Sequence, residues 1–148
     1  MPIRRVTPAE AVELVAQGWI YVDVRTIPEF DAGHPRGAYN VPLMQQGPGG
    51  RVANPDFVAV AEGALGKDAR IVLGCAGGTR ARRAADLLAG AGFEHLAEMP
   101  TGFSGGEKDA TGRIVTPGWK GAGLPIDEKA EPGHRYDDLA AKVREGKP

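Results

Sequence analysis

Cys75 is the residue whose type and position best fit covalent chemistry, and it is the only cysteine among the 148 residues. It follows the apolar run Ile71–Gly74, which predicts a buried strand. After it, small and apolar residues recur at helical spacing on one face: Ala81, Ala84, Ala85 and Leu88. A thiol at a helix N-terminus meets unpaired N–H groups and the positive end of the helix dipole, which favour its anionic form. We therefore expect Cys75 to be a reactive thiolate, the alternative being an inert buried thiol at a strand end.

The loop after the cysteine has the residue types of an anion-binding loop. Gly77 and Gly78 tolerate positive φ, which allows successive N–H groups to point at one place. Arg80 lies in the first helical turn, where a cation is disfavoured by ~0.3–1 kcal/mol against the helix dipole. The two arginines that follow have an aspartate at ion-pairing spacing in the same helix, whereas Arg80 has none. The sequence therefore assigns Arg80 to an anionic substrate or to the charged sulfur of Cys75.

Strand and helix patterns alternate along the chain and predict the elements that position this loop. A capping box, Thr7-Pro8-Ala9-Glu10, begins a first helix. Further helices are expected over residues 54–65 and 80–90, and strands over residues 20–23, 38–41, 70–74 and 95–99. Gln45–Gly50 and Ser104–Pro117 are polar and glycine-rich, which indicates exposed loops, the first of them at the rim of the site. The alternation is typical of an α/β fold with a central parallel sheet flanked by helices on both faces.

Two predicted strands end in polar residues that are expected to meet. Asp23 ends one strand and Cys75 follows another, and ligands of parallel sheets bind at the carboxyl ends of the strands. Asp23 and Arg25 are therefore candidate supporting residues. A structural role is favoured for both, because an aspartate at a strand end accepts backbone N–H bonds and an arginine bridges loops. His34 is also assigned a structural role, since a nucleophile that is already ionised needs no base.

Three segments, in this order, resemble the sequence signatures of the rhodanese-like sulfurtransferases. The active-site pattern of that family, Cys-x-x-Gly-x-Arg between a strand and a helix, is matched by Cys75, Gly78 and Arg80. The upstream signature of the family is similar to Asp23-Val24-Arg25, Glu29-Phe30, Gly33-His34 and Gly37–Pro42. Its closing segment is similar to Gly102-Phe103 and Trp119–Pro125. The resemblance covers roughly residues 5–126 and implies a single rhodanese-like domain with the fold predicted above.

The resemblance also implies a reaction. A member of this family moves a sulfane sulfur from thiosulfate, or a similar small-molecule donor, to a thiol or cyanide acceptor through a persulfide on its cysteine, here Cys75. Backbone N–H groups of the loop would hold the persulfide, which assigns a binding role to Ala76, Gly77, Gly78, Thr79 and Arg80. The chemistry requires neither a metal nor an organic cofactor.

Length and composition set further limits. One domain is expected over residues 1–126, followed by a tail over residues 127–148. Within the tail, the thin apolar stripe of residues 135–145 leaves two alternatives, a short docked helix and a partly disordered segment. The net charge is −1, which gives no indication of a nucleic-acid partner, and no apolar stretch has membrane-spanning length. A lone cysteine and a start without the apolar core of a signal peptide predict a cytoplasmic protein. One cysteine and three scattered histidines do not suggest a metal site.

Two alternatives to a sulfurtransferase follow from the same loop. Related phosphatases and arsenate reductases have a cysteine loop one residue longer, which cradles a tetrahedral oxyanion. Only four residues separate Cys75 from Arg80 here, and this shorter loop better suits a single sulfur atom. The second alternative is a binding module without catalysis on the same fold. The cysteine, glycines and arginine retained in one loop argue against it.

Overall fold

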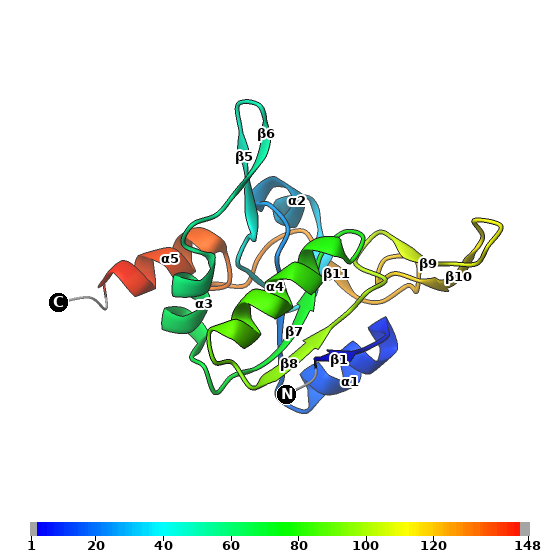
Figure 1. Ribbon diagram of the computed structural model, residues 1–148, viewed down its shortest axis with the longest axis horizontal. Coiled ribbons are helices and arrows are strands. Elements are labelled where there is room, and N and C mark those ends of the chain that lie inside the picture. The colour runs from blue at the N-terminus through cyan, green and yellow to red at the C-terminus, as the bar shows by residue number, and fades with distance from the viewer. Residues whose placement is uncertain (1–2, 146–148) are drawn as a thin grey trace.

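The computed structural model describes residues 3–145, which form an α/β fold (Figure 1). The central sheet is parallel, with the strand order β1-β8-β7-β2-β4. Its strands are β1 (Arg4–Arg5), β2 (Ile20–Asp23), β4 (Tyr39–Asn40), β7 (Arg70–Gly74) and β8 (His95–Glu98). The helices are α1 (Pro8–Ala16), α2 (Ile27–Ala32), α3 (Phe57–Leu65), α4 (Thr79–Gly90) and α5 (Tyr136–Glu145). Within residues 3–145, every helix is too short or too polar to cross a bilayer.

Helices cover both faces of the sheet, which confirms the predicted fold class. Side chains of β2 and β7 alternate between the faces, as the period of two in a strand requires. Val22, Ile71 and Leu73 are buried together with residues of α3, α4 and α5. Tyr21 and Val72 point the other way and are buried with residues of α1 and α2. The central strands are therefore apolar on both sides, which holds β7 and the loop after it in a fixed position.

Two helices begin with the same local signal. Thr7 caps α1 and Thr26 caps α2, each by accepting the N–H of the glutamate three residues later, Glu10 or Glu29. Each glutamate in turn accepts the N–H of its threonine, which completes a capping box. This pattern predicted α1 from the sequence, whereas α2 was not predicted. The signal was present, because Thr26-Ile27-Pro28-Glu29 has the same threonine-to-glutamate spacing and a proline in the first turn.

Two segments expected to be loops are antiparallel hairpins, so those predictions were wrong. The first consists of β5 (Met44–Gly47) and β6 (Gly50–Ala53), and the second of β9 (Gly106–Lys108) and β10 (Ile114–Pro117). Both project from the body of the molecule (Figure 1). Pairing satisfies their backbone groups without a buried face, so they lack the apolar alternation that predicts a strand. A further short pair joins β3 (His34–Pro35) to β11 (Ile126–Asp127).

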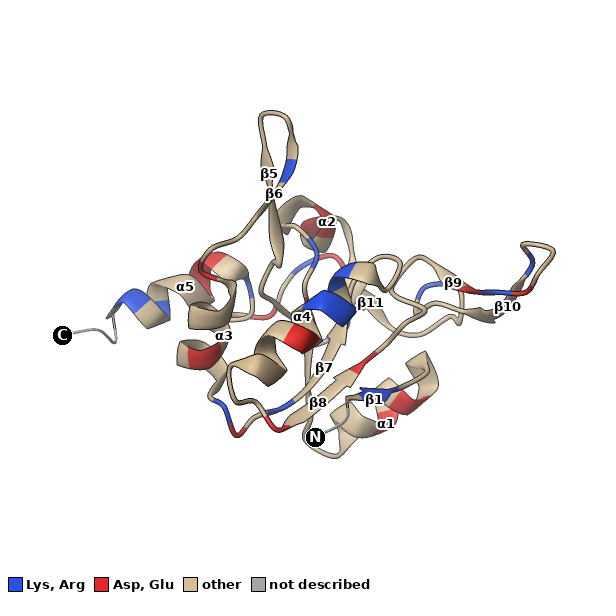
Figure 2. Ribbon diagram, in the orientation of Figure 1, with Lys and Arg blue, Asp and Glu red and all other residues tan. Residues whose placement is uncertain are grey.

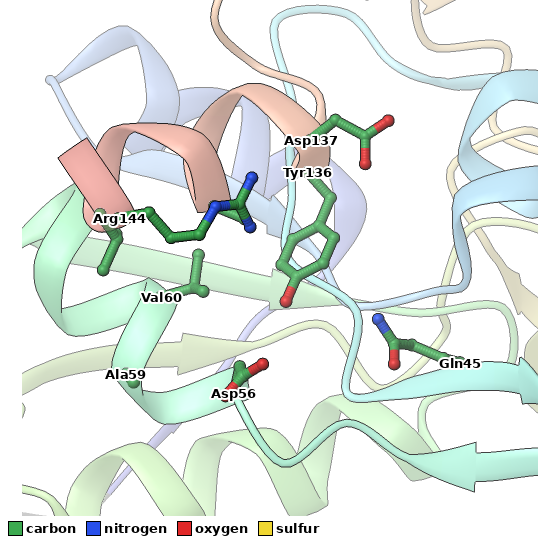
Figure 3. Close-up of a pocket in the computed structure, with 9 residues that line it drawn as sticks. Gln45, Asp56, Ala59, Val60, Tyr136, Asp137 and Arg144 are labelled. Carbon is green, nitrogen blue, oxygen red and sulfur yellow. The ribbon is translucent and has the colours of Figure 1, made fainter.

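The C-terminal helix packs on the body of the protein. Tyr136 and Leu139 of α5 are buried in the same cluster as Ile71 of the central sheet. A cavity of about 440 Å³ lies between α3 and α5. Figure 3 shows Tyr136 and Arg144 of α5 on one side of it, with Asp56 and Val60 from the α3 side opposite. The docked helix, one of the two alternatives for residues 135–145, is thus confirmed.

Candidate active site

The Cys75 sulfur lies between the end of β7 and the start of α4. Its residue is buried, and its Sγ accepts the backbone N–H groups of Gly78 (2.9 Å) and Ala81 (3.3 Å). These donors belong to the loop and to the first turn of α4, where N–H groups have no acceptor within the helix. The predicted strand–loop–helix placement of the cysteine is confirmed. Gly78 was among the predicted donors, whereas Ala81 was not, because its role depends on how the loop curls back.

The two loop glycines differ in what they do. Gly78 has φ +99° at the N-cap of α4, and a Cβ there would overlap the carbonyl oxygen of Pro100. Only glycine therefore fits without a shift of the backbone. Gly77 does not have positive φ, and an added Cβ would meet no atom within 4 Å. The sequence allowed positive φ at both glycines, and the structure uses it at Gly78 and not at Gly77.

Two other residues of the predicted binding loop, Ala76 and Thr79, lie on either side of these glycines. Ala76 is partly buried, and Thr79, the first residue of α4, is exposed. The carbonyl of Gly78 accepts the N–H of Arg82 at 3.1 Å, which begins the hydrogen bonding of the helix. The N–H groups of Thr79 and Arg80 precede that bond and belong to the open first turn. They remain the groups predicted to face a ligand.

A support segment after β8, residues 102–105, holds the cysteine loop in place through backbone hydrogen bonds. Phe103 donates its N–H to the carbonyl of Cys75 (2.6 Å), and Ser104 and Gly105 donate theirs to the carbonyl of Ala76 (3.2 and 3.0 Å). Gly102, at φ +71°, packs so closely that a Cβ would overlap the Ala76 carbonyl. The family-like Gly102-Phe103 pair therefore fixes the backbone under the cysteine. These contacts join residues about thirty positions apart, so local sequence patterns did not predict them.

Residues at the base of the second hairpin form hydrogen bonds to the segment that holds the cysteine loop. Gly118 donates its N–H to the carbonyl of Gly105 (3.0 Å), and Trp119 donates to that of Gly102 (2.9 Å). The Trp119 ring is buried, and its Nε1 donates to the carbonyl of Pro125 (2.8 Å). The packing role predicted for Trp119 is confirmed. β9 and β10 thus extend outward from two residues, Gly105 and Gly118, that brace the cysteine loop.

Arg80 forms a two-point ion pair with Glu29 of α2. Its Nη1 lies 2.6 Å from Oε1, its Nη2 lies 3.0 Å from Oε2, and the Arg80 side chain is 11% exposed. Burial raises the pKa of Glu29, but hydrogen bonds from Arg80 and Thr26 outweigh it and lower that pKa from 4.5 to about 2. The side-chain bond to Glu29 raises the pKa of Arg80 further. Arg80 has no carboxylate at ion-pairing distance in its own helix, and Glu29 of α2 provides one. The Arg80 guanidinium is directed at that carboxylate.

Asp23 and Arg25 form a buried ion pair beside the loop. Arg25 Nη2 lies 2.7 Å from Asp23 Oδ2 and donates to the carbonyl of Gly33 (2.6 Å). Its guanidinium also stacks over the Phe103 ring, 4.3 Å from the centroid. Burial lowers the pKa of Arg25, but the bonds to Asp23 outweigh this and raise it. Asp23 is the register partner of Gly74, so the predicted meeting of the two motifs is confirmed, with contacts that support a structural role.

His34 is buried in the body of the protein. Its ring stacks on Phe30 with centroids 3.8 Å apart, and its Nδ1 lies 2.8 Å from the Phe30 carbonyl oxygen. Nδ1 therefore has a hydrogen-bond partner, and the ring is buried by stacking. The predicted structural role of His34 is confirmed.

The parallel sheet and the helices on both of its faces define an α/β domain in which a cysteine sulfur lies at the N-terminus of the helix that follows its strand. Comparison with known families gives the same result, since the family model of the rhodanese-like domain matches residues 7–109. The chain belongs to the rhodanese-like domain family.

Named relatives extend this comparison. "Thiosulfate sulfurtransferase 16, chloroplastic" of Arabidopsis thaliana is 38% identical over 99 residues, which are 67% of this chain and 82% of that protein. "Thiosulfate sulfurtransferase GlpE" of Haemophilus influenzae is 31% identical over 127 residues, 86% of this chain and 97% of that protein. "Protein HIGH ARSENIC CONTENT 1, mitochondrial" of Arabidopsis thaliana is 38% identical over 90 residues, 61% of this chain and only 53% of that protein.

A solved structure has the same fold. The crystal structure of Rv0390 from M. tuberculosis superposes with a TM-score of 0.70 at 25% identity. The match covers 87% of this chain and 100% of the other. The fold described above is therefore that of a rhodanese-like domain over most of its length.

Proposed function

We propose that this protein is a sulfurtransferase that carries a sulfane sulfur as a persulfide on Cys75. The observation that carries the proposal is the position of Sγ, which accepts N–H groups from Gly78 and Ala81 at the start of α4. Hydrogen bonds and the helix dipole there favour a sulfur anion, which is the form that attacks. The thiosulfate sulfurtransferase names of relatives at 31–38% identity support the same assignment.

The reaction proceeds in two displacements. The Cys75 thiolate attacks the outer sulfur of thiosulfate, the sulfur–sulfur bond of the donor breaks, and sulfite leaves with the electron pair. A thiol or cyanide nucleophile then attacks the terminal sulfur of the persulfide, and the Cys75 thiolate leaves with its electron pair. The open N–H groups of Thr79 and Arg80 add to that of Gly78 in stabilising the terminal sulfur. Neither displacement needs a metal or an organic cofactor.

A reaction with an oxyanion such as arsenate or phosphate is the second candidate. It is favoured by one relative, the one named for high arsenic content. The loop argues against it, because only four residues separate Cys75 from Arg80 and the Arg80 guanidinium is directed at Glu29. The single sulfur atom that is transferred to Cys75 can be held by N–H groups alone and does not need that guanidinium. Sulfur transfer is therefore the preferred assignment.

Mass spectrometry after incubation with thiosulfate tests this proposal. Native protein should gain one sulfur atom on Cys75 and lose it on addition of cyanide, with formation of thiocyanate. Cys75→Ser should gain none and form no thiocyanate while unfolding at nearly the same temperature, because the two side chains differ by one atom. Thiocyanate formation by the serine variant would refute the role of Cys75. Faster turnover of aryl phosphates than of thiosulfate by the native protein would favour the second candidate.

We also propose that the protein works in the cytoplasm with small-molecule donors and acceptors. The single cysteine must stay reduced between turnovers, which a reducing compartment ensures. The near balance of charge, with 18 basic and 19 acidic residues, supports small-molecule partners over nucleic acid.

A further inference from the structure

The first hairpin brings one charged residue to the active site. Strands β5 and β6 pair in register from Met44–Ala53 to Gly47–Gly50, so that Pro48 and Gly49 form the tip. Figure 1 shows this hairpin standing beside α2, and Figure 2 shows a single basic segment on it. That segment is Arg51, the only charged residue between Met44 and Ala53. Its charge therefore sets the electrostatic character of the hairpin.

Arg51 shares the carboxylate of Glu29 with Arg80. Its Nη2 lies 3.4 Å from Glu29 Oε2, the same oxygen that Arg80 Nη2 binds at 3.0 Å. The other oxygen, Oε1, accepts Arg80 Nη1 (2.6 Å) and the N–H and hydroxyl of Thr26 (3.1 and 3.0 Å). The contact to Arg51 is the longest of the set, and the other four are hydrogen bonds of good length. The carboxylate is thus already satisfied without Arg51.

The cluster of Glu29, Arg51 and Arg80 carries an excess positive charge. With its pKa near 2, Glu29 is ionised at neutral pH and cancels one of the two guanidinium charges. Arg80 is held at two nitrogens and is 11% exposed, whereas Arg51 is held at one and is 46% exposed. Arg51 is therefore the guanidinium of the cluster that can turn towards a ligand, and its planar N–H groups match the oxygens of an anion.

The hairpin also leaves space next to α2. A cavity of about 290 Å³ lies between Ile27 and Pro28 at the start of α2 and Gln45 and Gln46 of β5. Pro28 adjoins Glu29, and Gln46 is the register partner of Arg51. The register partner of Arg51 therefore lines, together with Gln45, a space large enough for a small anion.

We propose that Arg51 binds the sulfonate end of an anionic sulfane-sulfur donor and makes the enzyme selective for doubly charged donors such as thiosulfate. The inference rests on the sulfurtransferase function proposed above. Attack of a thiolate on a dianion brings like charges together, and the excess charge of the cluster offsets this repulsion. Arg80 orders the first turn of α4 through Glu29, while Arg51 recruits the donor. The two arginines therefore have separate roles.

Steady-state kinetics with two donors tests this inference. Thiosulfate is the dianion, and the comparison donor is an alkyl hydropersulfide, which has no sulfonate and carries at most one negative charge. Attack of Cys75 on its terminal sulfur releases an alkanethiolate and leaves the same persulfide. Arg51→Gln should raise the KM for thiosulfate by about three- to tenfold, with little change in kcat or in the kinetics of the hydropersulfide, because an exposed charged hydrogen bond is lost. Arg51→Lys should recover most of the loss. Added sodium chloride should raise the KM of the native protein for thiosulfate, and much less that of the arginine variant.

The matched control is Arg36→Gln. Arg36 also contacts a carboxylate at 3.4 Å, that of Asp127, but it stands outside the cluster. An equal KM for thiosulfate in Arg51→Gln and Arg36→Gln would overturn the inference, as would an equal loss with the hydropersulfide. Failure of the native protein to accept sulfur from either donor would instead refute the sulfurtransferase function, and the role of Arg51 with it. Retention of the native melting temperature in the lysine variant separates these outcomes from misfolding.

Discussion

At the scale of single residues, the chemistry depends on how charge is distributed around one sulfur. The Cys75 sulfur accepts hydrogen bonds from backbone N–H groups, which carry partial charges and need no counter-ion. The full charge of Arg80 is compensated by Glu29, which links α2 to the first turn of α4. Glu29 appeared in the sequence only as one letter of a family signature. Its importance follows from the contacts it makes to Thr26, Arg51 and Arg80.

Glu29→Gln should lower stability in a way that depends on pH. Its folded-state pKa near 2 lies below the ordinary 4.5, so the ionised carboxylate stabilises the fold above about pH 5. This contribution is lost as pH falls from about 5 towards 2, because both states then bind the proton. We expect the variant to be about 1–2 kcal/mol less stable at pH 7, with a smaller difference at pH 3. Urea unfolding of both proteins at the two pH values measures this, and a constant difference would contradict it.

At the scale of elements, the loop from Cys75 to Arg80 is shaped by packing on both sides. The carbonyl of Pro100 lies against Gly78 on one side, and the support segment holds the carbonyls of Cys75 and Ala76 on the other. The position of the N–H donors therefore depends on a residue without a side chain at 78. Gly77 has no such constraint, which gives a natural pair for comparison.

Gly78→Ala should destabilise the protein and impair sulfur loading, whereas Gly77→Ala should do neither. The left-handed conformation at Gly78 costs an alanine about 1–2 kcal/mol, and the overlap with Pro100 adds to this. The shift moves the N–H that contacts Sγ, so we expect loading by thiosulfate to slow more than tenfold. The Gly77 variant should stay within about 0.5 kcal/mol of the native protein. Chemical denaturation and rapid-mixing mass spectrometry measure the two effects. Similar behaviour of both variants would show that the loop tolerates movement.

At the scale of the whole molecule, the C-terminal helix belongs to the folded body. Leu139 of α5 is buried beside the face of α3, and Gly63 of α3 allows this approach, since a Cβ there would meet Val143 at 2.9 Å. The family model ends at residue 109, so α5 lies beyond the matched segment while α3 lies within it. We propose that the folding unit includes α5 and that residues 127–145 are not an independent tail.

Leu139→Ala should therefore lower the free energy of unfolding by about 2–4 kcal/mol, as for a buried leucine in a core. Leu87→Ala, at an exposed position of α4, is the control and should change it by less than about 1 kcal/mol. Urea unfolding followed by tryptophan fluorescence reports on both. An equally small effect of the two substitutions would indicate that α5 unfolds separately from the sheet.

The sequence by itself determined the parts of this protein that depend on local spacing. The capping box at Thr7 fixed the start of α1, the apolar run at Ile71 fixed β7, and the single cysteine between strand and helix fixed the candidate nucleophile. The parallel sheet followed from the alternation of strands and helices. Each of these is a short-range pattern, so it can be recognised without knowing what packs against it.

Only the tertiary structure decided which residues surround the candidate nucleophile. The Glu29–Arg80 pair joins residues 51 positions apart, and the support for the Cys75 loop comes from Phe103 and Ser104. The two hairpins could not be predicted from the sequence either. Their valines and isoleucine are exposed, so these segments lack the alternation of buried and exposed residues that indicates a strand. Contacts between distant segments depend on the complete packing of the chain, and a guanidinium binds whichever carboxylate the fold places beside it.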